Sequence, residues 1–177
     1  MRKKTYRTAL GGVLSALALA VVFMGSVFPF SEYIGPVIAS LCVMLFRTEF
    51  GGKSSFLMYL SVSLLSLFIS PSIESSLLFT AFLGWYPIVK KPVEAHTRQP
   101  ITLLVKYALV NISVLSLYSC LIHVFQLTAL TEDFLGEPAW MTSVLIILYN
   151  ITFYFYDRIL SQMEYAYIHR FRERLIR

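Results

Sequence analysis

Charged residues are scarce in this sequence, and none stands in the middle of one of its long apolar stretches. Only 14% of the 177 residues are charged, whereas 57% are hydrophobic. A soluble domain of this size could not cover so many apolar side chains with a polar surface, so we expect a membrane-embedded domain. A proton relay or an ion-coupled pump needs ionisable groups within the membrane, and the uncharged centres of these stretches argue against both.

Cysteine and histidine are also rare. Cys42 and Cys120 both lie within apolar stretches, so we expect small core residues rather than a disulfide. The three histidines include no pair at i, i+4 spacing, so no metal site is predicted. An intramembrane enzyme would need paired carboxylates, a Ser/His pair or a metal cluster at one depth. Glu32 and His123 are the only candidates on the outer side, so we predict neither a catalytic site nor a cofactor.

Basic residues are missing from every second connection between the apolar stretches. The connections without a base carry only acidic charges, at Glu32, at Glu74, and at Glu132, Asp133 and Glu137. The fifteen Lys and Arg residues form four clusters, at residues 2–7, 47–53, 90–106 and 158–177. Because basic residues stay on the cytoplasmic side of a membrane, this alternation predicts six crossings with both termini in the cytoplasm. The clusters also favour contact with anionic lipid head groups over nucleic acid.

The apolar stretches predict an all-α membrane protein, a bundle of six transmembrane helices. A span needs about 20 helical residues. The predicted spans are 8–28 (an uncleaved first helix), 33–46, 54–70, 72–89, 101–128 and 138–160, and the longest cytoplasmic loop is 92–100. Residues 1–160 are therefore one six-helix domain. Residues 161–177 carry a regular apolar stripe among arginines, which predicts an amphipathic cytoplasmic tail on the inner membrane surface.

Polar residues within the predicted spans lie mostly in the outer half. A cavity open to the outside could be lined by Glu32, Tyr33, Tyr118, His123, Gln126, Thr142 and Tyr149. Such a set suits a small, mostly apolar or aromatic solute held by a few hydrogen bonds. The alternative is that polar groups bond to their own helices or join neighbouring ones, as we expect for Asn111 and Asn150. We interpret one stripe on the sixth helix as an interhelical contact line: Ser143, Asn150, Tyr154 and Asp157.

The first predicted helix carries small residues at four-residue spacing, at Gly12, Ala16 and Ala20. This spacing places them on one face, where another helix can approach closely. The other helix could belong to a partner protein or to this same bundle. The motif alone favours neither.

Two stretches support a family resemblance. The stretch from Thr8 to Ala20 resembles the first helix of the substrate-binding S components of energy-coupling factor (ECF) transporters, in which an Ala-x-x-x-Ala arrangement contacts the coupling membrane subunit. Ala16 and Ala20 are the matching positions. The stretch from Ser63 to Lys90 is similar to uncharacterised membrane proteins of Gram-positive bacteria that are grouped with the S components.

The resemblance implies six helices, cytoplasmic termini, capture of a small solute from outside, and docking on a coupling subunit whose ATPases are separate chains. A membrane scaffold of the cell-envelope machinery would share this size and topology. The two hypotheses differ in the interior, because a scaffold needs no outward cavity and would be packed solid around Tyr118 and Tyr149.

Overall fold

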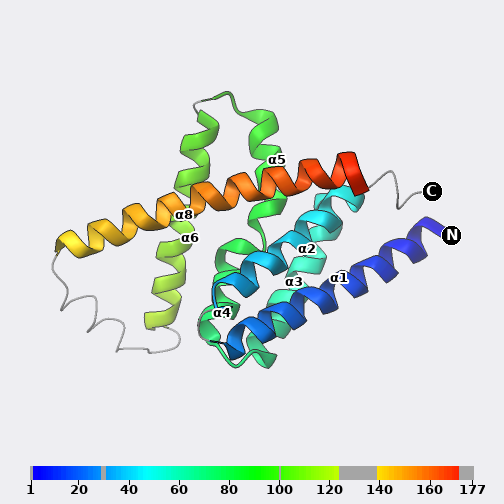
Figure 1. Ribbon diagram of the computed structural model, residues 1–177, viewed down its shortest axis with the longest axis horizontal. Coiled ribbons are helices and arrows are strands. Elements are labelled where there is room, and N and C mark those ends of the chain that lie inside the picture. Colours follow the sequence, from blue (N-terminus) through cyan, green and yellow to red (C-terminus); the bar gives the residue numbers. More distant parts are fainter. Residues whose placement is uncertain (1, 29–30, 100, 124–138, 172–177) are drawn as a thin grey trace.

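The computed structural model describes residues 2–28, 31–99, 101–123 and 139–171, and within these ranges the chain is helical and has no strand. This confirms the all-α class. The elements are α1 (Arg2–Val27), α2 (Ile34–Phe50), α3 (Gly52–Ile69), α4 (Ile73–Leu78), the π-helix η2 (Phe79–Leu83), α5 (Tyr86–His96), α6 (Ile101–His123), α8 (Ala139–Ala166) and the π-helix η3 (Tyr167–Phe171). Figure 1 shows their arrangement.

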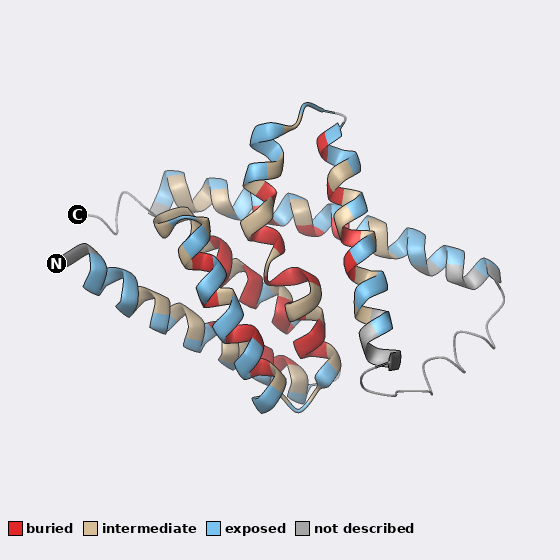
Figure 2. Cartoon of the chain, turned by 180° about the vertical axis from the view of Figure 1, so that it is seen from behind, coloured by how far each residue is buried: buried red, intermediate tan, exposed pale blue. Residues whose placement is uncertain are grey.

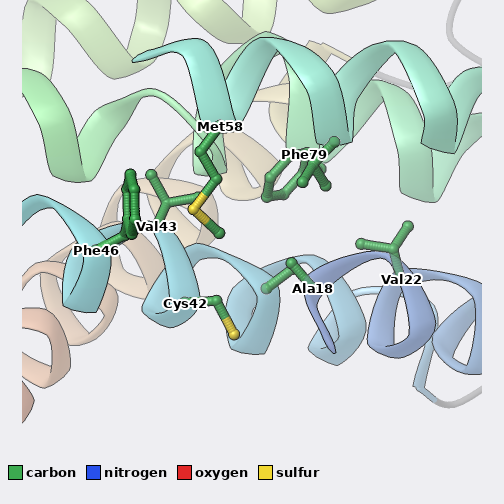
Figure 3. Close-up of a cluster of buried hydrophobic side chains, with 9 residues drawn as sticks. Ala18, Val22, Cys42, Val43, Phe46, Met58 and Phe79 are labelled. Carbon is green, nitrogen blue, oxygen red and sulfur yellow. The ribbon is translucent and has the colours of Figure 1, made fainter. Parts of the chain in front are cut away.

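Helices α1, α2 and α3 pack side by side around the first hydrophobic core (Figures 1 and 3). This core includes Ala18 and Val22 of α1, Val43 and Phe46 of α2, and Met58 of α3. Buried Cys42 belongs to this core and has no disulfide, as its apolar surroundings in the sequence predict. The side chain of Cys120 is outside the described residues.

Two glycines allow α1 and α2 to approach closely where the chain turns between them. A Cβ atom added to Gly35 would lie 2.9 Å from the carbonyl oxygen of Val21 and 3.1 Å from the Cα atom of Gly25. A Cβ atom on Gly25 would lie 3.0 Å from the Cα atom of Gly35. The two backbones are therefore in direct contact, and neither position has room for a side chain.

The fourth predicted span, 72–89, is not one continuous helix. It is divided into α4, η2 and the first turn of α5, and α5 then continues through Pro92 to His96 in place of the expected loop. The chain turns at Gly84, where a Cβ atom would lie 2.6 Å from the ring of Tyr59. Insertions of π-helix into membrane helices leave carbonyl groups that need other donors.

Side chains supply those donors. The carbonyl oxygens of Thr80, Ala81 and Leu83 accept hydrogen bonds. The donors, in the same order, are the Tyr59 hydroxyl (2.6 Å), the Trp85 indole N–H (2.6 Å) and the Tyr156 hydroxyl (3.2 Å). The residue that would bond to the Leu83 carbonyl in a regular α-helix is Pro87, which has no N–H. Tyr156 on α8 therefore takes over a backbone bond that this sequence cannot make.

Helices α5 and α6 stand side by side, and α8 crosses both (Figures 1 and 2). A second core forms at the crossing, where Phe82 and Tyr86 pack against Phe153 and Tyr156 at ring-centre distances between 5.3 and 6.1 Å. The first part of α8 extends past α6, away from the α1–α3 bundle (Figure 1). The helix continues without a break through residue 160 to Ala166.

Two described helices are long and apolar enough to cross a membrane, Lys4–Val27 and Gly52–Ile69. Only 22% and 28% of an apolar 18-residue window in each helix is buried, so most of this surface faces outward, unlike that of a core helix in a soluble protein (Figure 2). A shorter apolar helix covers Ile101–Leu117. This surface supports association of the chain with a membrane.

Candidate functional site

The small residues of α1 lie on its outward face. Gly12, Ala16 and Ala20 are exposed, and a Cβ atom on Gly12 would meet nothing within 4 Å. At 3.6 residues per turn, this face is opposite the one that carries buried Ala18 and Val22. The described contacts therefore do not use the small face for packing within the bundle. We call Gly12, Ala16 and Ala20 the docking face, and the described residues leave it exposed.

Large apolar side chains flank the docking face. Val13 is 65% exposed, and Val27 is 53% exposed. An apolar surface favours contact with lipid or with another apolar surface.

Of the residues predicted to line an outer cavity, Glu32 has a structural partner. Its carboxylate accepts a hydrogen bond from the hydroxyl of Ser72, which in turn caps α4 by accepting from the Ser75 N–H at 3.3 Å. Nearby, the hydroxyls of Ser26 and Ser70 are 2.5 Å apart. Glu32 thus ties the α1–α2 turn to the start of α4.

The remaining members of the predicted set are not brought together by the described contacts. Tyr33 is 62% exposed beside Glu32, whereas Tyr149 packs against the second core on α8. The beginning of α8 lies far from the α1–α2 turn (Figure 1). Tyr118, His123 and Thr142 stand on α6 and α8, but their side chains are outside the described residues, and so is Gln126 altogether.

A buried charge network, which the sequence analysis missed, joins α5, α6 and α8. It consists of Tyr86, Lys90, Glu94, Lys106 and Asp157. The Lys90 ammonium lies 2.7 Å from Oδ1 of Asp157, and the Lys106 ammonium lies 2.9 Å from Oδ2 of Asp157. The Tyr86 hydroxyl donates to the same Oδ1 at 2.6 Å, and Lys106 also pairs with Glu94 at 2.6 Å.

The two lysines of the network are nearly closed to solvent, whereas the side chain of Glu94 is 40% exposed. The side chains of Lys90 and Lys106 are 5% and 7% exposed, and that of Asp157 is 19% exposed. Lys90 also donates to Ser161 at 2.6 Å. Burial lowers the pKa of Lys90, which lies just beyond the predicted fourth span, while the hydrogen bond and charge of Asp157 oppose that shift. Both carboxylate oxygens of Asp157 are engaged within the network. We therefore interpret the network as a link between three helices rather than as a reactive site.

The sequence did contain a signal for this network. Lys106 falls within the predicted fifth span and Asp157 within the sixth, and an ionisable residue in a span calls for a partner. Its position next to the loop instead places Lys106 in the basic cluster 90–106. The predicted contact line on the sixth helix holds at two positions, because Asn150 accepts from Asn111 at 3.1 Å and Asp157 binds both lysines. Tyr154, in contrast, is 50% exposed.

Among the residues that the structure describes, no group of three His, Cys, Asp or Glu side chains could hold a metal ion. No family model, curated protein or solved structure matches this chain. The functional argument therefore rests on the geometry and on the sequence.

Proposed function

We propose that this chain is the substrate-binding S component of an ECF-type uptake transporter, located in the cell membrane of a Gram-positive bacterium. It crosses the membrane six times with both termini in the cytoplasm. It captures a small solute from outside and docks on a coupling subunit through α1. The observation that carries the proposal is the outward position of Gly12, Ala16 and Ala20 on a long apolar helix.

The docking step has a physical basis. Small residues let two helix backbones approach closely within lipid, and the contact is then stabilised by van der Waals packing rather than by burial from water. Among the described residues, the docking face is part of the surface of α1 that stays exposed. The resemblance assigns this helix to contact with the coupling subunit.

The distribution of basic clusters supports the topology. The ring of Tyr6 on α1 packs against that of Phe50 at the end of α2, with ring centres 5.9 Å apart. Tyr167 of η3 donates to Glu49 at 3.2 Å. Three of the four basic clusters (2–7, 47–53 and 158–177) thus include or adjoin residues at one end of the bundle, as a common cytoplasmic side requires.

The test is association with a coupling subunit. We expect the double variant Ala16→Leu/Ala20→Leu to lose pull-down of an ECF coupling subunit, because bulky side chains separate the two helices. Ala108→Leu, at an exposed position of α6, is the matched control and should retain association. Equal association of both variants, or none of the unchanged protein, would contradict the proposal.

A second candidate is a non-enzymatic scaffold of the cell-envelope machinery. It is favoured by Glu32, whose carboxylate is engaged with the hydroxyl of Ser72. A scaffold would dock through the same face of α1 but would hold no solute. Mass spectrometry of the detergent-purified protein distinguishes the two, because an S component should release a small molecule on denaturation and a scaffold should not.

A further inference from the structure

Four exposed basic side chains lie where α1 and α3 begin and where η3 follows α8. We call this set the basic end: Lys4 and Arg7 of α1, Lys53 of α3 and Arg170 of η3. Among the described residues, none of the four forms an ion pair. Their charges are therefore accessible to a group outside the protein.

The four bases come together through contacts at the end of α2. The ring of Tyr6 packs against that of Phe50, so the start of α1 lies beside the end of α2. Gly51 alone separates α2 from α3, and Tyr167 of η3 donates to Glu49 of α2. The starts of α1 and α3 and the end of α8 therefore lie at the same end of the molecule, as Figure 1 shows for α1 and α8.

The carboxylates at this end are engaged within the protein. Glu164 pairs with Lys91 and accepts a hydrogen bond from Thr48 at 3.1 Å. Glu49 accepts from Tyr167 at 3.2 Å. Both acids are half-buried, whereas the four bases are exposed. The accessible charge at this end is therefore mainly positive.

The bases of the cluster 90–106 are used differently. Lys90 and Lys106 are paired with Asp157, and Lys91 is paired with Glu164. The sequence analysis treats the four clusters alike as lipid contacts, but the structure occupies most of this cluster with ion pairs inside the chain. The basic end is the larger group of exposed bases that these pairs leave untouched.

We propose that the basic end binds the head groups of anionic phospholipids. Exposed bases attract an anionic membrane surface, and a head group reaches them there without a cavity. Exposed tyrosines adjoin the bases, Tyr6 at 51% and Tyr165 at 67%, and tyrosine is enriched at the depth of the head groups. Under the proposed topology this end faces the inner leaflet. The inference goes beyond the proposed function, because it requires a membrane-embedded chain but neither a solute nor docking by α1.

The experiment is native mass spectrometry of the full chain in detergent with equal concentrations of phosphatidylglycerol and phosphatidylcholine. The unchanged protein should retain phosphatidylglycerol in preference. Arg7→Gln/Lys53→Gln should lower the ratio of the two retained lipids at least about fivefold, since one base near an anionic surface contributes about 1 kcal/mol. The control Arg98→Gln/Arg158→Gln removes two exposed bases elsewhere and should leave the ratio unchanged.

The matched control makes the result decisive. Both double variants change the net charge equally, so equal ratios for the two would overturn the proposal. The absence of any preference in the unchanged protein would also overturn it, and is the result expected if the basic end meets an acidic protein segment instead. If Arg7→Gln/Lys53→Gln does not fold, Lys4→Gln/Arg170→Gln replaces it in the same comparison.

Pull-down of the coupling subunit is measured separately on the same variants. It should be unchanged, because the four bases are not part of the docking face. Lipid preference without pull-down would refute the transporter and keep the lipid surface, and pull-down without lipid preference would do the reverse.

Discussion

Lys106 and Asp157 are 51 residues apart in the sequence, yet the ammonium of one lies 2.9 Å from the carboxylate of the other. Asp157 neutralises two buried lysines at once, Lys90 through one oxygen and Lys106 through the other. The three helices that meet there are consequently joined by charge as well as by apolar packing.

Asp157→Asn tests the importance of this link. The variant keeps the size of the side chain but leaves two buried cations without a full counter-charge. Removing one partner of a buried ion pair costs about 3–5 kcal/mol, and the 19% exposure of Asp157 favours the lower end of this range. Thermal unfolding in detergent should therefore show a clearly lower midpoint. Arg158→Gln, at the exposed neighbouring position, is the control, and an equal midpoint for both variants would refute the expectation.

Gly35→Ala tests the close contact of α1 and α2. The new Cβ atom would overlap the Val21 carbonyl oxygen at 2.9 Å, so the helices must separate and the variant should lose about 1–3 kcal/mol of stability. Gly12→Ala is the control for the stability measurement, because its added Cβ atom meets nothing within 4 Å. This variant should gain up to about 1 kcal/mol, since alanine is the better helix former. Denaturant titrations that rank the two variants in the opposite order would show that α1 and α2 do not touch at these glycines.

Tyr156→Phe tests the bond that replaces the missing N–H of Pro87. The variant keeps the ring in the second core but leaves the Leu83 carbonyl oxygen without its side-chain donor and removes the 2.9 Å bond to Ser40. An unsatisfied buried acceptor costs about 1–3 kcal/mol. Hydrogen exchange should become faster around residues 84–88. Tyr154→Phe, at a half-exposed ring on the same helix, should leave that exchange unchanged.

Local properties of the chain were sufficient to predict most helices. The spans expected at 33–46, 54–70 and 138–160 correspond to α2, α3 and α8, with ends that differ by a few residues. The apolar periodicity that produces these helices acts over one or two turns, so the sequence displays it directly. The same reasoning failed at 72–89, because the division at Gly84 depends on Tyr59 and Tyr156 from other helices.

The candidate docking face was likewise predicted in part from the sequence and decided in part by the packing. The spacing of Gly12, Ala16 and Ala20 places them on one side of a helix, but only the packing of Ala18 and Val22 decides that this side faces outward.

The amino-acid sequence by itself determined that this is an all-α protein with long apolar helices and with its bases confined to alternate connections, because helix formation and hydropathy are properties of short segments. The tertiary structure alone decided that Lys90 and Lys106 share Asp157 and that Glu32 bonds to Ser72. Each of these arrangements brings together residues from separate segments of the chain. Their charges can be counted in the sequence, but the distances between them are set by how the helices pack.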